Sequence, residues 1–353
     1  MNLFLANGYV NMKKIFKLPE AFIFVTGARG TGKTYGGMKC LLDREILPEG
    51  RKFIYMRRTS KQLEIALTPE MNPFKPLNEK RKGTPEIHPF PINKYISGFY
   101  KTVINEDGDL EPLDGVPIGI AIPLSTFASV RGISAEDVDV MFYDEFIPQR
   151  DERKMKNEYE ALLNAYETIN RNRELQGRPP VKLIAVSNSN DIANPVYMGA
   201  RVIKDVIDMR RKKVNCKEFP KRNMALIDIQ DSPISLQKAN TALYQFAKDT
   251  KFTEMAIYND YGYIESNTKS LPHRELVPLY RVGEIQIDRW KGHDNYYVTS
   301  QFHGSVKESY SISDIDIRRF SIAHRDVVTY YYLNAIVFED FYLESVFIKM
   351  FLT

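Results

Sequence analysis

The sequence predicts an α/β fold, in which a parallel β-sheet is flanked by helices and is followed by a helical linker and a small C-terminal α+β region. Short apolar runs rich in β-branched and aromatic residues punctuate the first half of the chain, as expected of strands buried on both faces. Helical periodicity lies between some of these runs, which is typical of parallel strands joined by crossover helices. We expect three parts, at 1–228, 229–265 and 266–353.

The composition is that of an ordinary globular protein. Of 353 residues, 43% are apolar and 27% are charged, and the two cysteines have neither metal-ligand spacing nor a disulfide framework. The net charge of +4 permits a polyanionic partner without requiring one. The most apolar stretch, 327–353, is interrupted by charges and falls short of the ~20 apolar residues of a membrane span. We therefore expect no membrane partner, and the N-terminus indicates no signal peptide.

The elements follow in order along the chain. A β-hairpin with Asp107-Gly108 at its turn precedes the third strand. The clearest helix covers 159–173, with an apolar stripe at 3.6-residue spacing. A polar helical stretch at 235–250 leads to a last region of three strands and a pair of aromatic-rich helices. The strands predicted in the first half are 22–26, 53–56, 118–122, 139–143 and 182–186.

The stretch GARGTGKT matches the phosphate-binding P-loop pattern in full. Glycines let backbone N–H groups turn towards phosphate oxygens, Lys33 reaches the terminal phosphates, and Thr34 offers its hydroxyl to Mg²⁺. A chance glycine-rich turn is the alternative, but a strand precedes the motif and a helical pattern follows it. We therefore predict binding of ATP with Mg²⁺. The predicted nucleotide-binding residues are Gly27, Ala28, Arg29, Gly30, Thr31, Gly32, Lys33 and Thr34.

An acid pair, Asp144-Glu145, ends the buried run VDVMFYDEF. The aspartate is suited to hold the magnesium, and the glutamate to orient and deprotonate an attacking water. The alternative is a solvated acidic strand end. With the P-loop, the pair predicts a P-loop NTPase of the ASCE type that hydrolyses its nucleotide. Ser187 and Asn188, at the end of another strand, are candidates to sense the γ-phosphate or hold the water, and a plain turn is an equal alternative.

The motifs FVTGARGTGKTY, FIYMRR, AIPLS, FYDEF, ALLNAYETINRNRE and VSNSNDIANP occur in this order. In this order they resemble the DNA-packaging (encapsidation) ATPases of small tailed podoviruses of the phi-twenty-nine type, relatives of large terminase subunits. The similarity is dense over roughly 20–230 and diffuse beyond. It implies a ring ATPase, pentameric in the family, that docks at the portal vertex of an empty capsid in the host cytoplasm and drives double-stranded DNA inward. Whether a packaging RNA takes part is left open.

The resemblance also implies roles for individual residues. Asp144 matches the metal-site acid, Glu145 the catalytic base, and Arg171 the arginine finger that a neighbouring subunit inserts. Arg131 falls where the family has a lysine; the charge is kept, and the residue is a candidate trans-acting residue or DNA contact. On the predicted helix Arg171 lies on the polar face, whereas Arg173 lies near the packed stripe and is expected to be structural. An exposed helix arginine is usually only solvated.

The C-terminal part is expected, from the resemblance, to have a ribonuclease-H-like fold without a working nuclease site. Two-metal cleavage needs several converging carboxylates, and among the acids of this part only Asp288 has a suitable strand position. DNA contact is harder to place, although the basic run RRKKVNCKEFPKR, with Lys212 and Lys213, offers cations for phosphates. Alternative functions are a nucleotide-regulated binding module, a helicase or recombination ATPase, and a full terminase with nuclease activity.

Overall fold

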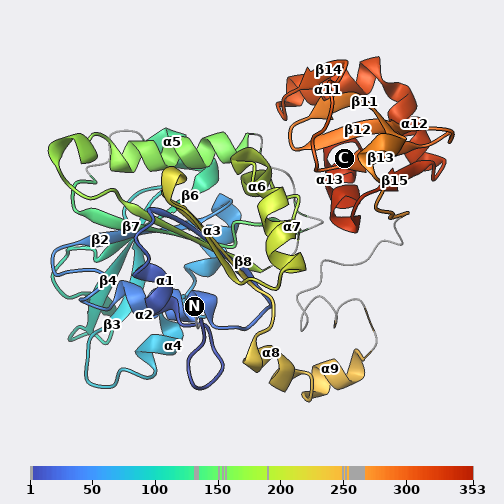
Figure 1. Cartoon of the computed structure of the whole chain (residues 1–353). Helices are drawn as coiled ribbons and strands as arrows, with labels where there is room; N and C mark the ends of the chain where they lie inside the picture. The colour runs from blue at the N-terminus through green and yellow to red at the C-terminus, as the bar shows by residue number, and fades with distance from the viewer. Residues whose placement is uncertain are drawn as a thin grey trace.

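The computed structural model describes most of the chain as two sheets with their helices (Figure 1). Between them in sequence, the described residues include two short helices, α8 (Pro233–Lys238) and α9 (Ala242–Phe246). Among the described residues, no helix combines the length and apolar character needed to cross a membrane. The residues described are 3–130, 135–149, 152, 155, 157–188, 191–248, 250, 253 and 267–352.

The first sheet has ten strands within the described residues, in the order β3-β4-β6-β2-β7-β8-β1-β10-β9, with β5 paired to β4. The strands from β6 to β10 in this order are all parallel, and β4 and β9 add antiparallel edges. Its strands are β1 (Phe22–Gly27), β2 (Lys52–Arg57), β3 (Glu86–Pro91), β4 (Ser97–Ile104), β5 (Leu110–Pro112), β6 (Gly119–Pro123), β7 (Val138–Asp144), β8 (Lys182–Asn188), β9 (Cys216–Phe219) and β10 (Met224–Ile229).

Helices cover both faces of this sheet, because successive side chains of each strand point to opposite faces. Ile23 and Val25 of β1 belong to an apolar cluster shared with the helices α1 to α4, whereas Phe24 belongs to a cluster shared with α5, α6 and α7. The result is a three-layer α/β arrangement (Figure 1). The helices are α1 (Met12–Phe16), α2 (Lys33–Leu41), α3 (Ser60–Ala66), α4 (Lys75–Asn78), α5 (Glu158–Asn170), α6 (Pro195–Ala200) and α7 (Ile203–Arg211).

All five strands predicted for the first half are present, and so is the hairpin at Asp107-Gly108. The basic run contains strand β9, and the fully buried strand β10 follows it, paired to β1. Neither strand was predicted. The predicted helix 159–173 is shorter in the structure, because α5 ends at Asn170 and Arg171 has a left-handed backbone with φ 46°.

The C-terminal part is α+β, as predicted. Strands β11, β12 and β13 form an antiparallel meander, with β14 parallel to β11 and β15 parallel to β13. The predicted terminal helix pair is interrupted by β15, because three residues between α12 and α13 extend the sheet. The elements are β11 (Leu276–Val282), β12 (Ile285–Trp290), β13 (Tyr296–Thr299), β14 (Glu308–Tyr310), α11 (Asp314–Ala323), α12 (Arg325–Tyr332), β15 (Ile336–Phe338) and α13 (Phe341–Phe351).

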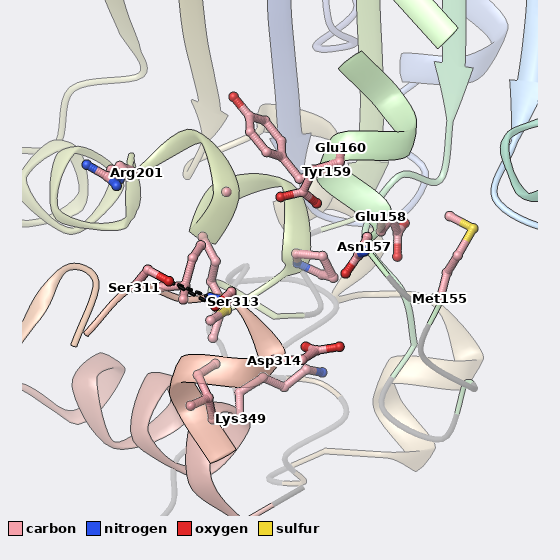
Figure 2. A pocket seen from close by; sticks show the side chains of 16 residues that line it. Met155, Asn157, Glu158, Tyr159, Glu160, Arg201, Ser311, Ser313, Asp314 and Lys349 are labelled. Carbon is pink, nitrogen blue, oxygen red and sulfur yellow. Dashed lines mark hydrogen bonds between the residues drawn. The ribbon is translucent and has the colours of Figure 1, made fainter. Parts of the chain in front are cut away.

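Polar contacts join the two parts around α7. Glu284 accepts a hydrogen bond from the backbone N–H of Ile203, the first residue of α7, at 3.4 Å. Arg211, the last residue of α7, forms an ion pair with Asp340 at 2.7 Å. Beside these contacts a cavity of about 480 Å³ lies between the start of α5, α6 and the C-terminal helices α11 and α13 (Figure 2).

Candidate active site

The candidate site lies where three neighbouring parallel strands end. Strand β8 lies between β1, which leads into the glycine-rich loop, and β7, which ends in the acid pair. The register pairs Gly27 with Asn188 and Asp144 with Val186. Because the strands are parallel, their carboxyl ends meet at one edge of the sheet, where open α/β folds bind their ligands. The P-loop, the acid pair and Asn188 therefore come together.

The glycine-rich loop is held from its carbonyl side. The ammonium of Lys33 donates to the carbonyl oxygens of Gly27 and Ala28, both at 2.9 Å. The N–H of Val10 donates to the carbonyl oxygen of Thr31 at 3.0 Å. Gly32, the residue before α2, has φ 88°, a value that glycine adopts without strain. The first N–H groups of α2 have no acceptor within the helix, which makes this end suited to an anion.

Lys33 is buried at the centre of the site. Its side chain also approaches Thr31 Oγ1 at 3.2 Å and Asn188 Oδ1 at 3.4 Å, and the residue is 6% exposed. Burial lowers the pKa of the ammonium to about 7, while the nearby Asp144 carboxylate acts in the opposite direction. A bound polyphosphate would supply the negative charge that this buried cation lacks.

Thr34 and Asp144 are in direct contact. The threonine hydroxyl donates to Asp144 Oδ1 at 3.0 Å, and the hydroxyl of Tyr55 donates to Asp144 Oδ2 at 3.2 Å. Burial raises the pKa of the Asp144 carboxyl. A hydroxyl and a carboxylate placed side by side, next to a phosphate-binding loop, fit the ligands that Mg²⁺ uses in nucleotide sites.

Glu145 is strained and is engaged by an arginine that the sequence analysis did not single out. Its backbone has φ 56°, unfavourable for a residue other than glycine, and its carboxylate forms an ion pair with Arg57. Arg57 also lies 3.3 Å from Asp144 Oδ2 and donates to the Tyr55 hydroxyl at 2.9 Å. The signal available in the sequence was a pair of arginines at the end of a buried strand, FIYMRR.

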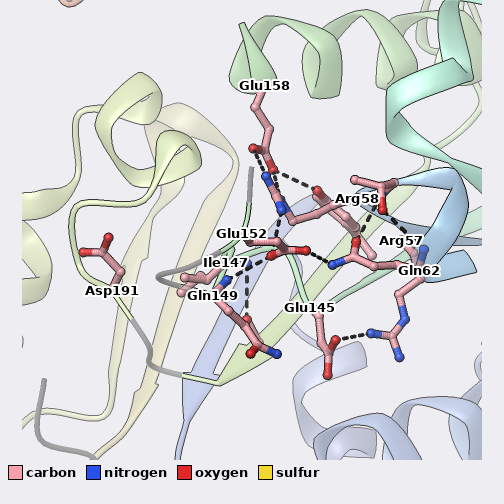
Figure 3. A network of polar contacts seen from close by, with 12 residues as sticks. Arg57, Arg58, Gln62, Glu145, Ile147, Gln149, Glu152, Glu158 and Asp191 are labelled. Atoms are coloured by element: carbon pink, nitrogen blue, oxygen red, sulfur yellow. Dashed lines mark hydrogen bonds and ion pairs between the residues drawn. The ribbon is translucent and has the colours of Figure 1, made fainter. Parts of the chain in front are cut away.

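The second arginine of that pair connects the site to α5 (Figure 3). The side chain of Arg58 is fully buried and contacts both carboxylate oxygens of Glu158, the first residue of α5, at 2.7 and 2.8 Å. It also pairs with Glu152 at 2.9 Å, in the segment that follows the acid pair. Arg57 and Arg58 therefore contact the acid pair and the start of α5, respectively.

The two predicted sensor residues are placed differently. Asn188 contacts Lys33, as described above, and lies within the site. Ser187 is 2% exposed, and its hydroxyl accepts a hydrogen bond from the N–H of Ile147 at 3.2 Å. Ser187 therefore orients the chain just after the acid pair, while Asn188 faces the loop.

Arg171 lies at the opposite edge of the sheet. Its neighbour Arg173 is buried and contacts the carbonyl of Val138, the first residue of β7, as well as the Asp139 carboxylate at 2.8 Å. Asp144 is at the other end of this seven-residue strand, about 20 Å away at ~3.3 Å per residue. Arg171 is exposed, and its Nε donates to the Thr168 carbonyl at 3.2 Å.

Of the other predicted cations, Arg131 lies outside the described residues. Lys212 and Lys213 follow α7 and are exposed. The two arginines before them, Arg210 and Arg211, form ion pairs with acids of β10 and of the C-terminal part. Only part of the basic run is therefore available to a polyanion.

A cavity of about 730 Å³ opens beside the start of α2. Tyr9, Gly32, Tyr35 and Lys80 are among the residues that line it. The ammonium of Lys80 lies 4.7 Å from the centre of the Tyr35 ring. This cavity adjoins the loop and has the size and aromatic lining of a small-molecule site.

In the C-terminal part, Asp288 is fully buried. Its carboxylate pairs with His303 at 2.7 Å and accepts from the Gln286 side chain at 2.9 Å. Among the described residues, no group of three or more histidine, cysteine, aspartate and glutamate side chains is placed to hold a metal ion.

A model of the family described as podovirus DNA encapsidation protein (Gp16) matches residues 92–345. The chain belongs to this podovirus DNA encapsidation family. The DNA packaging protein of Bacillus phage B103 is 30% identical over 83% of this chain and 82% of that protein. The DNA packaging protein of Bacillus phage phi29 is 28% identical over 72% of this chain, and the aligned region spans 66% of that relative, slightly less than two thirds.

The fold of this encapsidation-family chain is also that of a solved structure, the bacteriophage phi29 viral genome packaging motor assembly. The match has a TM-score of 0.62 and covers 97% of this chain and 98% of the other, at 21% identity. At this identity the likeness establishes the fold. The P-loop, the acid pair and Asn188 thus lie on a fold and in a family that agree with the resemblance drawn from the motifs.

Proposed function

We propose that this chain is an ATP-hydrolysing motor that drives double-stranded viral DNA into a preformed capsid. The observation that carries the proposal is the meeting of Lys33, the Thr34–Asp144 pair and Glu145 at one sheet edge, in a chain of the DNA encapsidation family. DNA packaging is the activity that the names of its phi29 and B103 relatives give.

The chemistry follows from the positions of the side chains. Lys33 moves from the loop carbonyls to the β- and γ-phosphates, and the cavity beside α2 takes the nucleoside. Thr34 and Asp144 would hold Mg²⁺, which would offset the negative charge that develops on the terminal phosphates. Glu145 accepts the proton of the attacking water, and Asn188 is within reach to orient that water or the phosphate.

Glu145 must leave Arg57 before it can act. A carboxylate held by a guanidinium is a weaker base, because the ion pair stabilises its charged form. In this proposal, the ion pair with Arg57 is a resting arrangement of Glu145. Separation of Glu145 from Arg57 accompanies hydrolysis in this proposal.

Arg171 acts on a neighbouring subunit. Its neighbour Arg173 contacts Val138 at the start of β7, and the length of that strand puts Val138 about 20 Å from Asp144, well beyond the reach of an arginine side chain. A cation that balances the transferred phosphoryl group is worth ~10³–10⁵ in rate. We therefore propose a homo-oligomeric ring, pentameric by analogy with the family, that docks at the portal vertex of an empty capsid in the host cytoplasm.

The remaining assignments complete the proposal. The chain divides into an ATPase region (1–228), a linker (229–265) and a C-terminal region (266–353), and the last described strand of the large sheet ends one residue past the first boundary, at Ile229. The exposed Lys212 and Lys213 are candidates to contact DNA phosphates. The C-terminal region handles DNA or docks without cleaving it, since Asp288 is committed to His303 and Gln286.

The test is packaging itself, with purified protein, empty capsids, genomic DNA and ATP, followed by nuclease protection. Lys33→Ala is expected to lose ATP binding and packaging, and Glu145→Gln to bind ATP normally but hydrolyse it at least 100-fold more slowly, because the base is gone. Protected DNA made by either variant at the wild-type level would refute the proposal. Strand separation of a duplex without any protection would favour the helicase alternative.

A further inference from the structure

A lysine distant in sequence contacts the phosphate-binding loop. The side chain of Lys238, the last residue of α8, donates to the carbonyl of Arg29 in the middle of the loop. A Cβ atom built on Gly30 would lie 2.0 Å from the Lys238 ammonium nitrogen, so that position is free only because residue 30 is glycine. No motif predicted this contact, since more than 200 residues separate the two segments.

The ammonium groups of Lys33 and Lys238 donate hydrogen bonds to consecutive carbonyl oxygens of the loop. Lys33 donates to those of Gly27 and Ala28, and Lys238 donates to the next one, that of Arg29. Lys33 is the residue that reaches the terminal phosphates in a P-loop. The ammonium of Lys238 thus contacts the loop one carbonyl beyond those that Lys33 contacts, close enough for its charge to act on Lys33.

The segment that carries Lys238 is fixed near the loop by its other end. Pro233 and Ile234 at the start of α8 pack against Gly8, where a built Cβ would lie 3.1 Å from each of them. Ser232 approaches the Gly8 carbonyl at 3.5 Å. The same N-terminal segment reaches the loop through Val10. α8 is therefore held at both of its ends, at Gly8 and at the loop.

The two ammonium groups lie near one another, and the carboxylates of Asp144, Glu145 and Asp228 also act on Lys33. The positive charge of Lys238 contributes to lowering the pKa of Lys33, so the two ammonium groups repel one another. Burial also lowers the pKa of Lys238. A triphosphate would relieve both penalties, because its terminal phosphate brings negative charge between the two cations.

We propose that Lys238 contacts the terminal phosphate of the bound nucleoside triphosphate, so that α8 is held against the site when the triphosphate is present and loses this contact in the diphosphate state. This rests on the proposed function, in which the loop binds ATP. Lys238 lies between the large sheet and the C-terminal part in sequence. The contact would thus tie the state of the nucleotide to the position of the segment that leads to the C-terminal part.

The test is calorimetric titration of the full chain with Mg²⁺ and either a non-hydrolysable ATP analogue or ADP. Lys238→Ala is expected to weaken binding of the triphosphate by about tenfold, the order of a charge-assisted hydrogen bond, and binding of ADP by less than about threefold. Lys238→Arg should keep most of the difference between the two nucleotides, because it keeps the charge. Lys248→Ala, which changes an exposed lysine ten residues further along, is the matched control and should bind as the wild type does.

Equal affinities of Lys238→Ala and wild type for the triphosphate, or an equal loss for both nucleotides, would overturn the inference. Lys238→Met keeps the length of the side chain and replaces the alanine variant if that one melts early. Because these comparisons use binding and not packaging, they can fail while wild-type packaging succeeds. A wild-type chain that binds no triphosphate would instead overturn the proposed function and this inference together.

Discussion

At the scale of single residues, the site contains a glutamate in an unfavourable backbone conformation. Glu145 has φ 56° immediately after a buried strand, and its N–H donates to the Val186 carbonyl at 2.8 Å. Residues other than glycine pay roughly 1–2 kcal/mol for such a conformation. Strain of this kind persists where the surrounding structure enforces it, and it is concentrated at functional sites.

This strain leads to a prediction about two variants that both lack the carboxylate. The free energy of unfolding of Glu145→Gly should exceed that of Glu145→Ala by ~1 kcal/mol, because glycine adopts the positive φ without strain and alanine does not. Both variants should lose ATP turnover. Urea unfolding with a parallel ATPase assay measures both effects. A glycine variant less stable than the alanine variant would show that the backbone is not strained in solution.

At the scale of elements, α5 spans the molecule from the site to the opposite edge of the sheet. Its first residue, Glu158, is held by the buried Arg58, and the turn after its last residue is held by Arg173. Asp139 pairs with Arg173 at 2.8 Å and also with Arg51. Both ends of the helix are therefore held by arginines. Arg171, just after the helix, is exposed at the surface.

The two arginines after α5 should respond differently to substitution. Arg173→Ala removes a buried partner of Val138 and Asp139, and should lower the free energy of unfolding by ~2–4 kcal/mol. Arg171→Ala should change it by less than ~0.5 kcal/mol and yet abolish most ATP turnover in the assembled ring. Denaturant unfolding and ATPase assays measure the two effects. Substantial ATP turnover by assembled Arg171→Ala rings would contradict the proposed role of Arg171.

Mixing experiments separate action on a neighbour from action within one subunit. Arg171→Ala and Glu145→Gln subunits are each expected to be inactive alone. In mixed rings some interfaces join an intact Glu145 to a neighbour's intact Arg171, so part of the ATPase activity should return. No recovery at any ratio, with mixed rings verified by native mass spectrometry, would place the arginine in its own site.

The sequence predicts those elements whose pattern lies within one short segment, and it does not predict those that depend on contacts between distant segments. The runs around β1, β2, β6, β7 and β8 are recognisable because strands buried on both faces are continuously apolar. Strand β15 has only three residues, and its pairing with β13 overrides a helical pattern. In the site, the motifs predict Lys33, Thr34, Asp144 and Glu145, whereas the contacts of Arg57 and Lys238 exist only after distant segments pack together.

At the scale of the whole molecule, α7 is the element that both parts share. Glu284 of the C-terminal part contacts its first residue, and Asp340 contacts its last. Arg210 of α7 pairs with the buried Asp228 of β10. The carboxylate of Asp228 also accepts a hydrogen bond from the hydroxyl of Thr26, next to the P-loop, at 2.9 Å. Helix α7 thus carries one polar contact towards the P-loop strand and another to the C-terminal part.

The contact at Glu284 should depend on pH. Burial raises the pKa of this carboxyl to about 7, with Asp205 acting in the same direction and the N–H of Ile203, Arg201 and Arg222 in the opposite one. Its pKa in the folded chain is above the unfolded value of about 4.5, so the charged form is disfavoured by folding. The stability that the protonated group contributes is complete below pH ~4.5 and is lost as the pH rises through about 7.

Glu284→Gln should remove this dependence, because the amide stays neutral. Its melting temperature should match that of the wild type near pH 5 and exceed it by a few degrees at pH 8. Glu218→Gln, which changes an exposed glutamate of β9, is the control and should follow the wild type at every pH. Melting curves of Glu284→Gln that shift in parallel with the wild type from pH 5 to 8 would contradict the assignment.

The separation of Arg171 from Asp144 has a consequence for the symmetry of the assembly. If Arg171 acts on a neighbour in a closed ring, as proposed, each subunit gives the arginine through one surface and receives one through another, so the interface between subunits is head-to-tail. Each subunit of such a ring completes the site of one neighbour and has its own site completed by the other, which gives the ring a direction around its axis. A closed ring has as many complete sites as subunits, whereas an open arc always has one fewer. Closure of the ring itself therefore becomes a condition for full activity.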